Sequence, residues 1–129
     1  MPEKDHRSTP QEALGPKEGK ESLKQYKKVF LFPGQSSQKV GMGEVLYSQS
    51  KAAKKVFEEV NDALGFPLSD IMFHGPEKVL QETVNAQPAV YTLSLATFKV
   101  LEEQLGDQMI IPESVAGHSV GTYATLPIT

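Results

Sequence analysis

The chain has 129 residues, of which 39% are hydrophobic and 22% charged, as in a soluble globular protein of one domain. Its net charge of −3 offers no basic surface to nucleic acid or an anionic membrane, and no apolar stretch is long enough to cross a bilayer. The chain contains no cysteine, which excludes disulfides, thiolate metal sites and a cysteine nucleophile.

Residues 1–27 combine Pro, Gly and Ser with closely spaced charges of both signs, and show no apolar periodicity. Such a segment buries too little apolar area to offset the entropy of ordering, so we predict a flexible polar tail. It lacks the apolar core of a secretory signal, and its acidic residues are unlike those of a transit peptide. We therefore expect a cytoplasmic location, with an organelle as the alternative for a eukaryotic chain.

The first predicted element is a strand at residues 29–32, where four apolar residues are stopped by Pro33-Gly34. A run that is apolar on both faces is typical of a central strand in a parallel sheet. A polar, glycine-containing loop is predicted to follow from Gln35 to Gly43.

A helix is predicted from Ser50 to Leu64. Its apolar residues recur at steps of three and four, Lys and Glu occupy the other face, and Gly65 stands where a C-terminal cap belongs. Two short helical pieces are expected next, around residues 68–72 and 76–83, with His74 in the loop between them.

A longer helix is predicted to begin between Asn85 and Pro88 and to run to Leu105, before Gly106. After it, Ser114-Val115-Ala116 form a short strand that leads into Gly117. The order of strand, helices, strand, sharp turn and helix start predicts an α/β fold with parallel strands and a crossover between them.

The sharp turn has the pattern G-x-S-x-G at residues 117–121. A chain that reverses from strand to helix within a few residues needs small residues at Gly117 and Gly121, because side chains there would clash with neighbouring backbone. Such a turn lifts the hydroxyl of Ser119 clear of the sheet. His118 points elsewhere in this geometry, so we interpret it as a packing or hydrogen-bonding residue of the turn rather than as a base. A turn of small residues without chemistry remains the alternative.

A second candidate feature is the loop at residues 33–38, directly after the first strand. Parallel sheets place ligand-binding groups at the carboxyl ends of their strands, and acyl transfer needs two backbone N–H donors for an oxyanion. An ordinary polar connector is the alternative.

Three segments together resemble the malonyl-CoA:acyl-carrier-protein transacylases and the acyltransferase domains of polyketide synthases. FLFPGQSSQ followed by GMG is similar to the opening of that family, HGPEKVLQETVNAQPAVYT to its middle segment, and AGHSVGTYATL to its nucleophile segment. The resemblance covers residues 28 to about 126. It implies the first part of an α/β-hydrolase-like, parallel-sheet acyltransferase subdomain, present here as an incomplete domain over residues 28–129.

The resemblance also implies an activity, in which malonyl moves from coenzyme A to a serine and then to the phosphopantetheine thiol of an acyl-carrier protein. Ser119 would be the nucleophile, and the backbone N–H groups of Gln35 and Val120 the oxyanion hole. Neither a bound cofactor nor a metal is expected, since malonyl-CoA is a substrate and the phosphopantetheine belongs to the carrier protein. Members of this family supply the base histidine and a carboxylate-binding arginine from segments that correspond to positions beyond residue 129.

Three residues depart from the family pattern. Ser36 replaces a glycine beside the expected oxyanion donor, Thr122 stands where glutamate is common, and Pro127 falls in the nucleophile helix. Two other functions therefore stay open. The chain could be a split or degenerate segment that binds a carrier protein or a complementing chain, or part of an α/β-hydrolase-type esterase or thioesterase.

Overall fold

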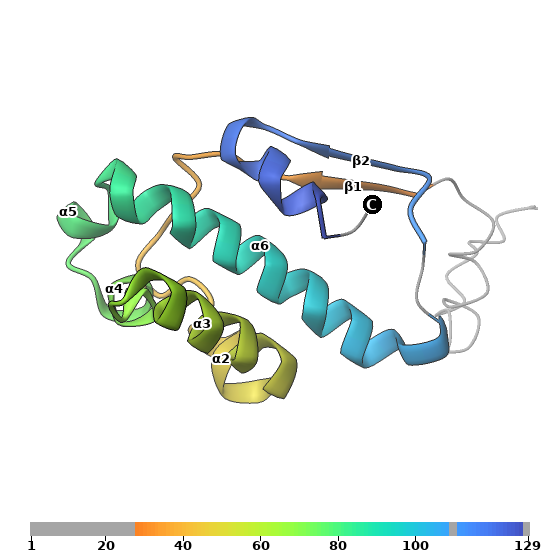
Figure 1. Ribbon diagram of the computed structural model, residues 1–129, viewed down its shortest axis with the longest axis horizontal. Coiled ribbons are helices and arrows are strands. Elements are labelled where there is room, and N and C mark those ends of the chain that lie inside the picture. Colours follow the sequence, from red (N-terminus) through yellow and green to blue (C-terminus); the bar gives the residue numbers. More distant parts are fainter. Residues whose placement is uncertain (1–27, 109–110, 128–129) are drawn as a thin grey trace, which may run out of the picture.

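The computed structural model describes residues 28–108 and 111–127 (Figure 1). The tail predicted at residues 1–27 lies outside the described residues. Of the helices in the described part, none combines the length and hydropathy needed to span a bilayer.

The sheet has two parallel strands, β1 (Val29–Phe32) and β2 (Ser114–Gly117), and the α-helices lie between them within residues 44–105. Their register pairs Val29 with Ser114 and Phe32 with Gly117. The predicted parallel pairing and helical crossover are confirmed, and Figure 1 shows the two strands side by side along α6 (Thr83–Leu105).

The two faces of β1 differ in their surroundings. The ring of Phe30 packs edge-on against Phe98 of α6, with ring centroids 6.0 Å apart. On the other face, Val29 and Leu31 remain 54% and 75% exposed. Within the described residues β1 pairs on one edge only and one of its apolar faces is uncovered, so its place as a central strand stays a prediction.

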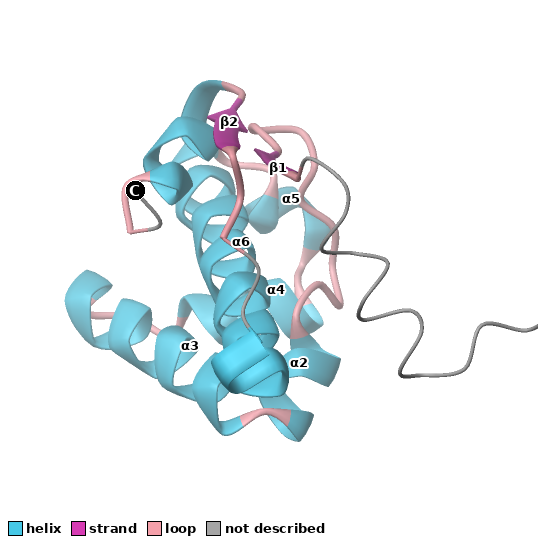
Figure 2. Cartoon of the chain, turned by 90° about the vertical axis from the view of Figure 1, so that its right-hand side faces the viewer, coloured by secondary structure: helices cyan, strands magenta, loops and turns pink. Residues whose placement is uncertain are grey.

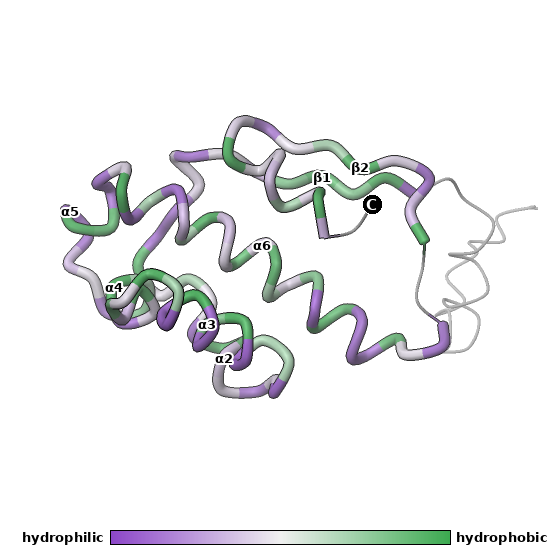
Figure 3. The backbone as a smooth tube through the Cα atoms, viewed as in Figure 1, coloured by the Kyte–Doolittle hydropathy of each residue, from purple (hydrophilic) through white to green (hydrophobic). Residues whose placement is uncertain are grey.

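An open apolar groove of about 500 Å³ runs along β1 and the C-terminal part of α6. Its lining includes residues 29–32 of the strand, Pro33 after it, and Leu93, Phe98 and Leu101 of the helix. Figure 3 shows β1 as a continuous apolar stretch beside β2. The edge of β1 that does not pair with β2 thus lies beside an accessible apolar surface.

Helix α3 (Lys51–Leu64) follows the predicted bounds. The Ser50 hydroxyl caps its first turn by accepting a hydrogen bond from the Ala53 N–H at 3.1 Å. Gly65 ends the helix with a left-handed φ of 75°, a conformation that glycine adopts without steric cost. Helix α2 (Glu44–Gln49) precedes α3 and was not predicted, because six residues are too few to show a helical period.

The two short helical pieces predicted around residues 68–72 and 76–83 correspond to α4 (Leu68–His74) and α5 (Glu77–Leu80). The assignment of His74 to a loop is wrong, since it is the last residue of α4. The predicted start of α6 is also two residues or more too late. Two N–H groups, those of Asn85 and Ala86, donate to the Glu82 carbonyl and begin the helix well before Pro88.

Helix α6 is the centre of the molecule. Figure 2 shows the strands on one side of it and α2 and α3 on the other. Its buried residues accordingly lie on more than one face: Asn85, Ala86, Ala89, Val90, Thr92, Ser94, Ala96 and Phe98. The main core lies between α3, α4 and α6, around Phe57, Leu68 and Met72, each at most 1% exposed.

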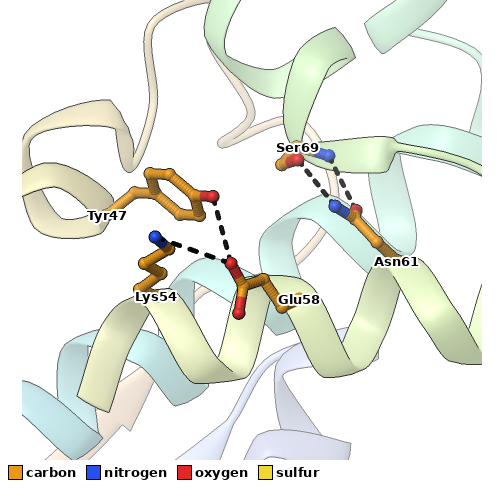
Figure 4. Close-up of polar contacts among 5 residues, drawn as sticks. All are labelled: Tyr47, Lys54, Glu58, Asn61 and Ser69. Atoms are coloured by element: carbon orange, nitrogen blue, oxygen red, sulfur yellow. Dashed lines mark hydrogen bonds and ion pairs between the residues drawn. The ribbon is translucent and has the colours of Figure 1, made fainter. Parts of the chain in front are cut away.

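Polar contacts join α2, α3 and α4 around this core (Figure 4). The Asn61 side chain donates to the Ser69 hydroxyl at 2.8 Å and accepts from the Ser69 N–H at 3.1 Å. At the other end of α3, the Tyr47 hydroxyl and the Lys54 ammonium both approach Oε1 of Glu58, at 3.4 Å and 3.8 Å. The paired amide contact of Asn61 fixes the first turn of α4 to α3.

The chain after Ser119 forms a 3₁₀ helix, η2 (Ser119–Thr125), where a helix start was predicted. Pro127 has no N–H to donate to the Tyr123 carbonyl, four residues before it. That carbonyl instead accepts the N–H of Leu126 at 3.3 Å, the tighter 3₁₀ pattern.

Candidate active site

The parallel pairing of β1 and β2 brings the two candidate segments together. Since Phe32 pairs with Gly117, both strands end at the same edge of the sheet. The loop after β1 and the turn after β2 therefore leave the sheet side by side. A hydrogen bond of 3.0 Å from the His118 N–H to the Phe32 carbonyl holds the turn against the end of β1.

The two glycines of the turn are required by close backbone contacts. A Cβ on Gly117 would lie 2.3 Å from the carbonyl of Gly121, and a Cβ on Gly121 would lie 2.4 Å from the carbonyl oxygens of Phe32 and Pro33. Any larger residue would push η2 away from the strands. The steric argument made from the sequence thus holds for both positions.

Ser119 occupies the position that the sequence predicts for a nucleophile. It is exposed and has a φ of 53°, a left-handed conformation that non-glycine residues rarely adopt. Strained backbone at an exposed serine between a strand and a helix is the geometry of a nucleophile elbow. Its neighbour Val120 is 8% exposed and packs inward.

Gly34 is packed directly against His118. A Cβ on Gly34 would lie 2.6 Å from Nδ1 of His118 and 2.7 Å from its carbonyl oxygen. The loop that carries Gln35 is therefore on the same side of the sheet as the elbow. His118 itself is exposed, and its imidazole lies beside this glycine rather than in the core.

Two backbone N–H groups near the turn are candidate donors for an oxyanion. Val120 lies in the first turn of η2, where N–H groups have no partner within the helix, and Gln35 begins the loop turn opposite. Such a pair of donors suits an oxyanion. The geometry is compatible with the roles predicted for Ser119, Gln35 and Val120, and these roles stay predictions.

The described contact between His74 and Glu44 lies outside the elbow. The contact of 3.9 Å between His74 Nε2 and Glu44 Oε1 joins two exposed groups on α4 and α2. Within residues 28–108 and 111–127, no three His, Asp or Glu side chains gather into a metal site. The described part of the site thus contains hydroxyl, amide and backbone groups together with the imidazole of His118.

Four polar residues beside the loop have no role in the sequence-based prediction. Gln38, Gln81, Thr83 and Gln87 contact one another or the Gln35 loop through their side chains. The NAQPA string contains Gln87, but spacing along a helix does not reveal that it faces a loop 52 residues earlier.

A parallel α/β sheet that ends in a serine-bearing elbow is an architecture of serine acyltransferases and hydrolases. Residues 29–128 match the acyl transferase domain, and the chain belongs to this family. The fold is accordingly part of an acyltransferase domain, as the sequence predicts. The match favours the acyltransferase interpretation over the esterase or thioesterase alternative.

Individual relatives agree with the family assignment. The chain is 45% identical over 97 residues to a malonyl CoA-acyl carrier protein transacylase of Bacillus subtilis (strain 168), covering 75% of this chain and 29% of that protein. Its fold is similar to that of the acyl-carrier-protein S-malonyltransferase of Bartonella henselae, with a TM-score of 0.74, 50% identity, and coverage of 80% of this chain and 33% of that one.

A third similar structure is a malonyl-transacylase in complex with a holo acyl-carrier protein of a type II polyketide synthase. It has a TM-score of 0.73 and 35% identity, and the match covers 80% of this chain and 32% of that one. The chain thus spans about a third of the length of the relatives that it matches.

Proposed function

We propose that this chain is the nucleophile-bearing segment of a malonyl-CoA:acyl-carrier-protein transacylase of fatty-acid or polyketide synthesis. The observation that carries the proposal is the contact of Gly34 with His118, since it brings the predicted oxyanion loop beside the strained, exposed Ser119. The printed names of the relatives support malonyl as the acyl group and an acyl-carrier protein as the acceptor. A cytoplasmic location remains part of this proposal.

The proposed reaction has two halves. The Ser119 oxygen forms a bond to the malonyl thioester carbon while the C–S bond to coenzyme A breaks, and the serine proton passes through a base to the departing thiolate. The carrier protein's phosphopantetheine thiol then attacks the serine ester, gives up its proton and returns Ser119 to the hydroxyl form. The N–H groups of Gln35 and Val120 stabilise the oxyanion in both halves.

The base belongs to the part of the domain that corresponds to positions beyond residue 129. We therefore expect the 129-residue chain alone to form the malonyl ester at a negligible rate, because a serine without a base is a weak nucleophile. Intact-mass spectrometry after incubation with malonyl-CoA measures this. A malonyl adduct on Ser119 at the rate of a full-length relative would contradict the expectation.

A chimera tests the function of the segment in a complete domain. Residues 28–127 replace the corresponding segment of the Bacillus subtilis transacylase, and malonyl transfer to a carrier protein is measured. We expect transfer by the chimera, and a loss on the order of 10⁴-fold or more in Ser119→Ala. Ser48→Ala on exposed α2 is the matched control and should keep the activity. Transfer that survives Ser119→Ala would refute the proposed role of this serine.

The uncovered apolar face of β1 favours a second candidate function, that of a segment which pairs with a separate chain carrying the remaining part of the domain. Mixing this chain with the remaining two thirds of the Bacillus subtilis transacylase should then restore malonyl transfer, although the two chains are not covalently linked. A monodisperse monomer that unfolds cooperatively and restores nothing on mixing would exclude this function.

A further inference from the structure

The loop that follows β1 is attached to the α5–α6 region through the side chain of Gln35. Nε2 of Gln35 donates to Oγ1 of Thr83 at 3.1 Å. Its Oε1 accepts a hydrogen bond from Nε2 of Gln87 at 3.3 Å. Both ends of this amide are therefore held by the first two turns of α6, which lie far from the loop in sequence.

A second amide, that of Gln38, attaches the other end of the loop. Gln38 is 7% exposed, and its Oε1 accepts the Ser36 N–H at 2.7 Å. Its Nε2 donates to Oε1 of Gln81 at 2.5 Å. A buried amide needs such partners, because burial without a hydrogen-bond partner is unfavourable. The loop is thus linked to the segment between α5 and α6 at two points.

The loop requires this support because it has little structure of its own. Residues 33–39 lie outside any helix or strand, and Ser36 has a φ of 85°. A local contact, from the Ser37 hydroxyl to the Gly34 carbonyl at 2.6 Å, closes the loop but does not fix it to the rest of the molecule. An oxyanion donor acts well only if it is already in place when charge develops.

We propose that Thr83 and Gln87, together with the Gln38–Gln81 pair, are positioning residues that set the peptide N–H of Gln35 relative to Ser119. We call Gln35, Gln38, Gln81, Thr83 and Gln87 the amide brace. The inference rests on the proposed function, since it assigns the brace to the oxyanion donor. None of the four partners touches the reacting atoms, and they act through the Gln35 backbone.

The order of the loop in the full 129-residue chain provides the test, measured as ¹⁵N order parameters of the Gln35 and Ser36 backbone. Thr83 and Gln87 are exposed, so Thr83→Val and Gln87→Ala should fold. We expect order parameters near 0.8 in the unaltered chain and below about 0.6 in these variants. Gln104→Ala, at another exposed position of α6, is the matched control and should leave them unchanged.

Two further measurements separate positioning from general stability. Thr83→Ser keeps the hydroxyl and should restore the order of the loop. The order parameters of Phe57 and Met72 in the core should stay at their original values in every variant. Unchanged Gln35 and Ser36 order in both Thr83→Val and Gln87→Ala would overturn the proposal, and so would an equal loss of order throughout the chain.

The result is independent of whether the chimera transfers malonyl. A loop that stays rigid in both variants would refute the positioning role of the amide brace and would leave the proposed role of Ser119 intact. If the loop loosens and the chimera is inactive, the proposed acyl-transfer function fails, whereas the amide brace still anchors the loop.

Discussion

Ser36 and Ser119 are the non-glycine residues with positive φ in the described part of the chain, at 85° and 53°. Both lie at the candidate site, and residues in left-handed conformations cost roughly 1–2 kcal/mol each. Strain of this kind persists where surrounding contacts enforce it. At Ser119 it exposes the hydroxyl, whereas at Ser36 it occurs where the family pattern has glycine.

Ser36→Gly should stabilise the chain by about 0.5–1 kcal/mol, because relief of the left-handed strain exceeds the added freedom of the unfolded chain. The free energy of unfolding in urea measures the effect. Ser48→Gly is the control, since Ser48 lies within α2 and glycine there should destabilise by about 0.5–1 kcal/mol. Equal signs for the two substitutions would contradict the assignment of strain to Ser36.

Gly121→Ala should destabilise the chain by about 1–3 kcal/mol, because its methyl group would lie against two backbone carbonyls of the β1 end. Gly106→Ala is a suitable comparison, since a Cβ there meets nothing within 4 Å and only the backbone conformation, with φ 48° and ψ −124°, opposes the change. Urea unfolding of both variants gives the difference. A smaller loss at Gly121 than at Gly106 would show that η2 can move away freely.

At the scale of elements, Ser50 connects two helices that are far apart in sequence. Its hydroxyl oxygen accepts the Ala53 N–H at the start of α3, and the hydroxyl donates to Oε2 of Glu103 on α6. Ser50 is 9% exposed, so water replaces these partners poorly. One small side chain therefore caps α3 and joins it to the central helix.

Ser50→Ala should cost about 1–2 kcal/mol through loss of the cap and of the contact with Glu103. Ser50→Thr retains a hydroxyl and should recover most of the loss. Combining Ser50→Ala with Glu103→Gln in a double-mutant cycle separates the two contributions. Additive effects of the two substitutions would show that the contact with Glu103 contributes nothing.

The elements that can be predicted correctly from the sequence are those with strong local signals. Helix α3 has a serine cap, a clear apolar stripe and a terminal glycine, and its bounds were correct. The predicted start of α6 between Asn85 and Pro88 is too late, because the helix accommodates Pro88 at its sixth position. Helix α2 is too short to show a helical period, and His74 is the last residue of α4, where a local pattern does not fix the exact end of a helix.

The parts of the candidate site that steric constraints determine can be predicted from the sequence. Gly117 and Gly121 must be small, and the strand before them places Ser119 at the end of the sheet. The amide brace was not predictable, since it depends on how α6 is oriented against the loop. Glutamine and threonine side chains have no spacing that identifies their partners in advance.

At the scale of the whole molecule, the two sides of the sheet are unequal. One side is covered by α6 and η2, whereas the face with Val29 and Leu31 is open and adjoins the groove along β1. Contiguous exposed apolar surface beside a strand edge favours association. The chain should therefore self-associate unless a partner covers this face.

Leu31→Thr should weaken that self-association, because it removes apolar surface while keeping a residue suited to a strand. Sedimentation velocity over a range of concentrations measures the change. Val45→Thr on α2 is the matched control, since Val45 is 63% exposed but lies outside the groove. Equal effects of the two substitutions would show that association does not involve β1.

The parallel register also fixes when the site can form during synthesis. Phe32 emerges from the ribosome early, whereas its partner Gly117 follows only after every helix from α2 to α6. Until then, the aromatic side chains of β1 have no strand beside them, and closure of so long a loop is slow. The loop after β1 and the turn that carries Ser119 can therefore meet only after all of these helices have been synthesised.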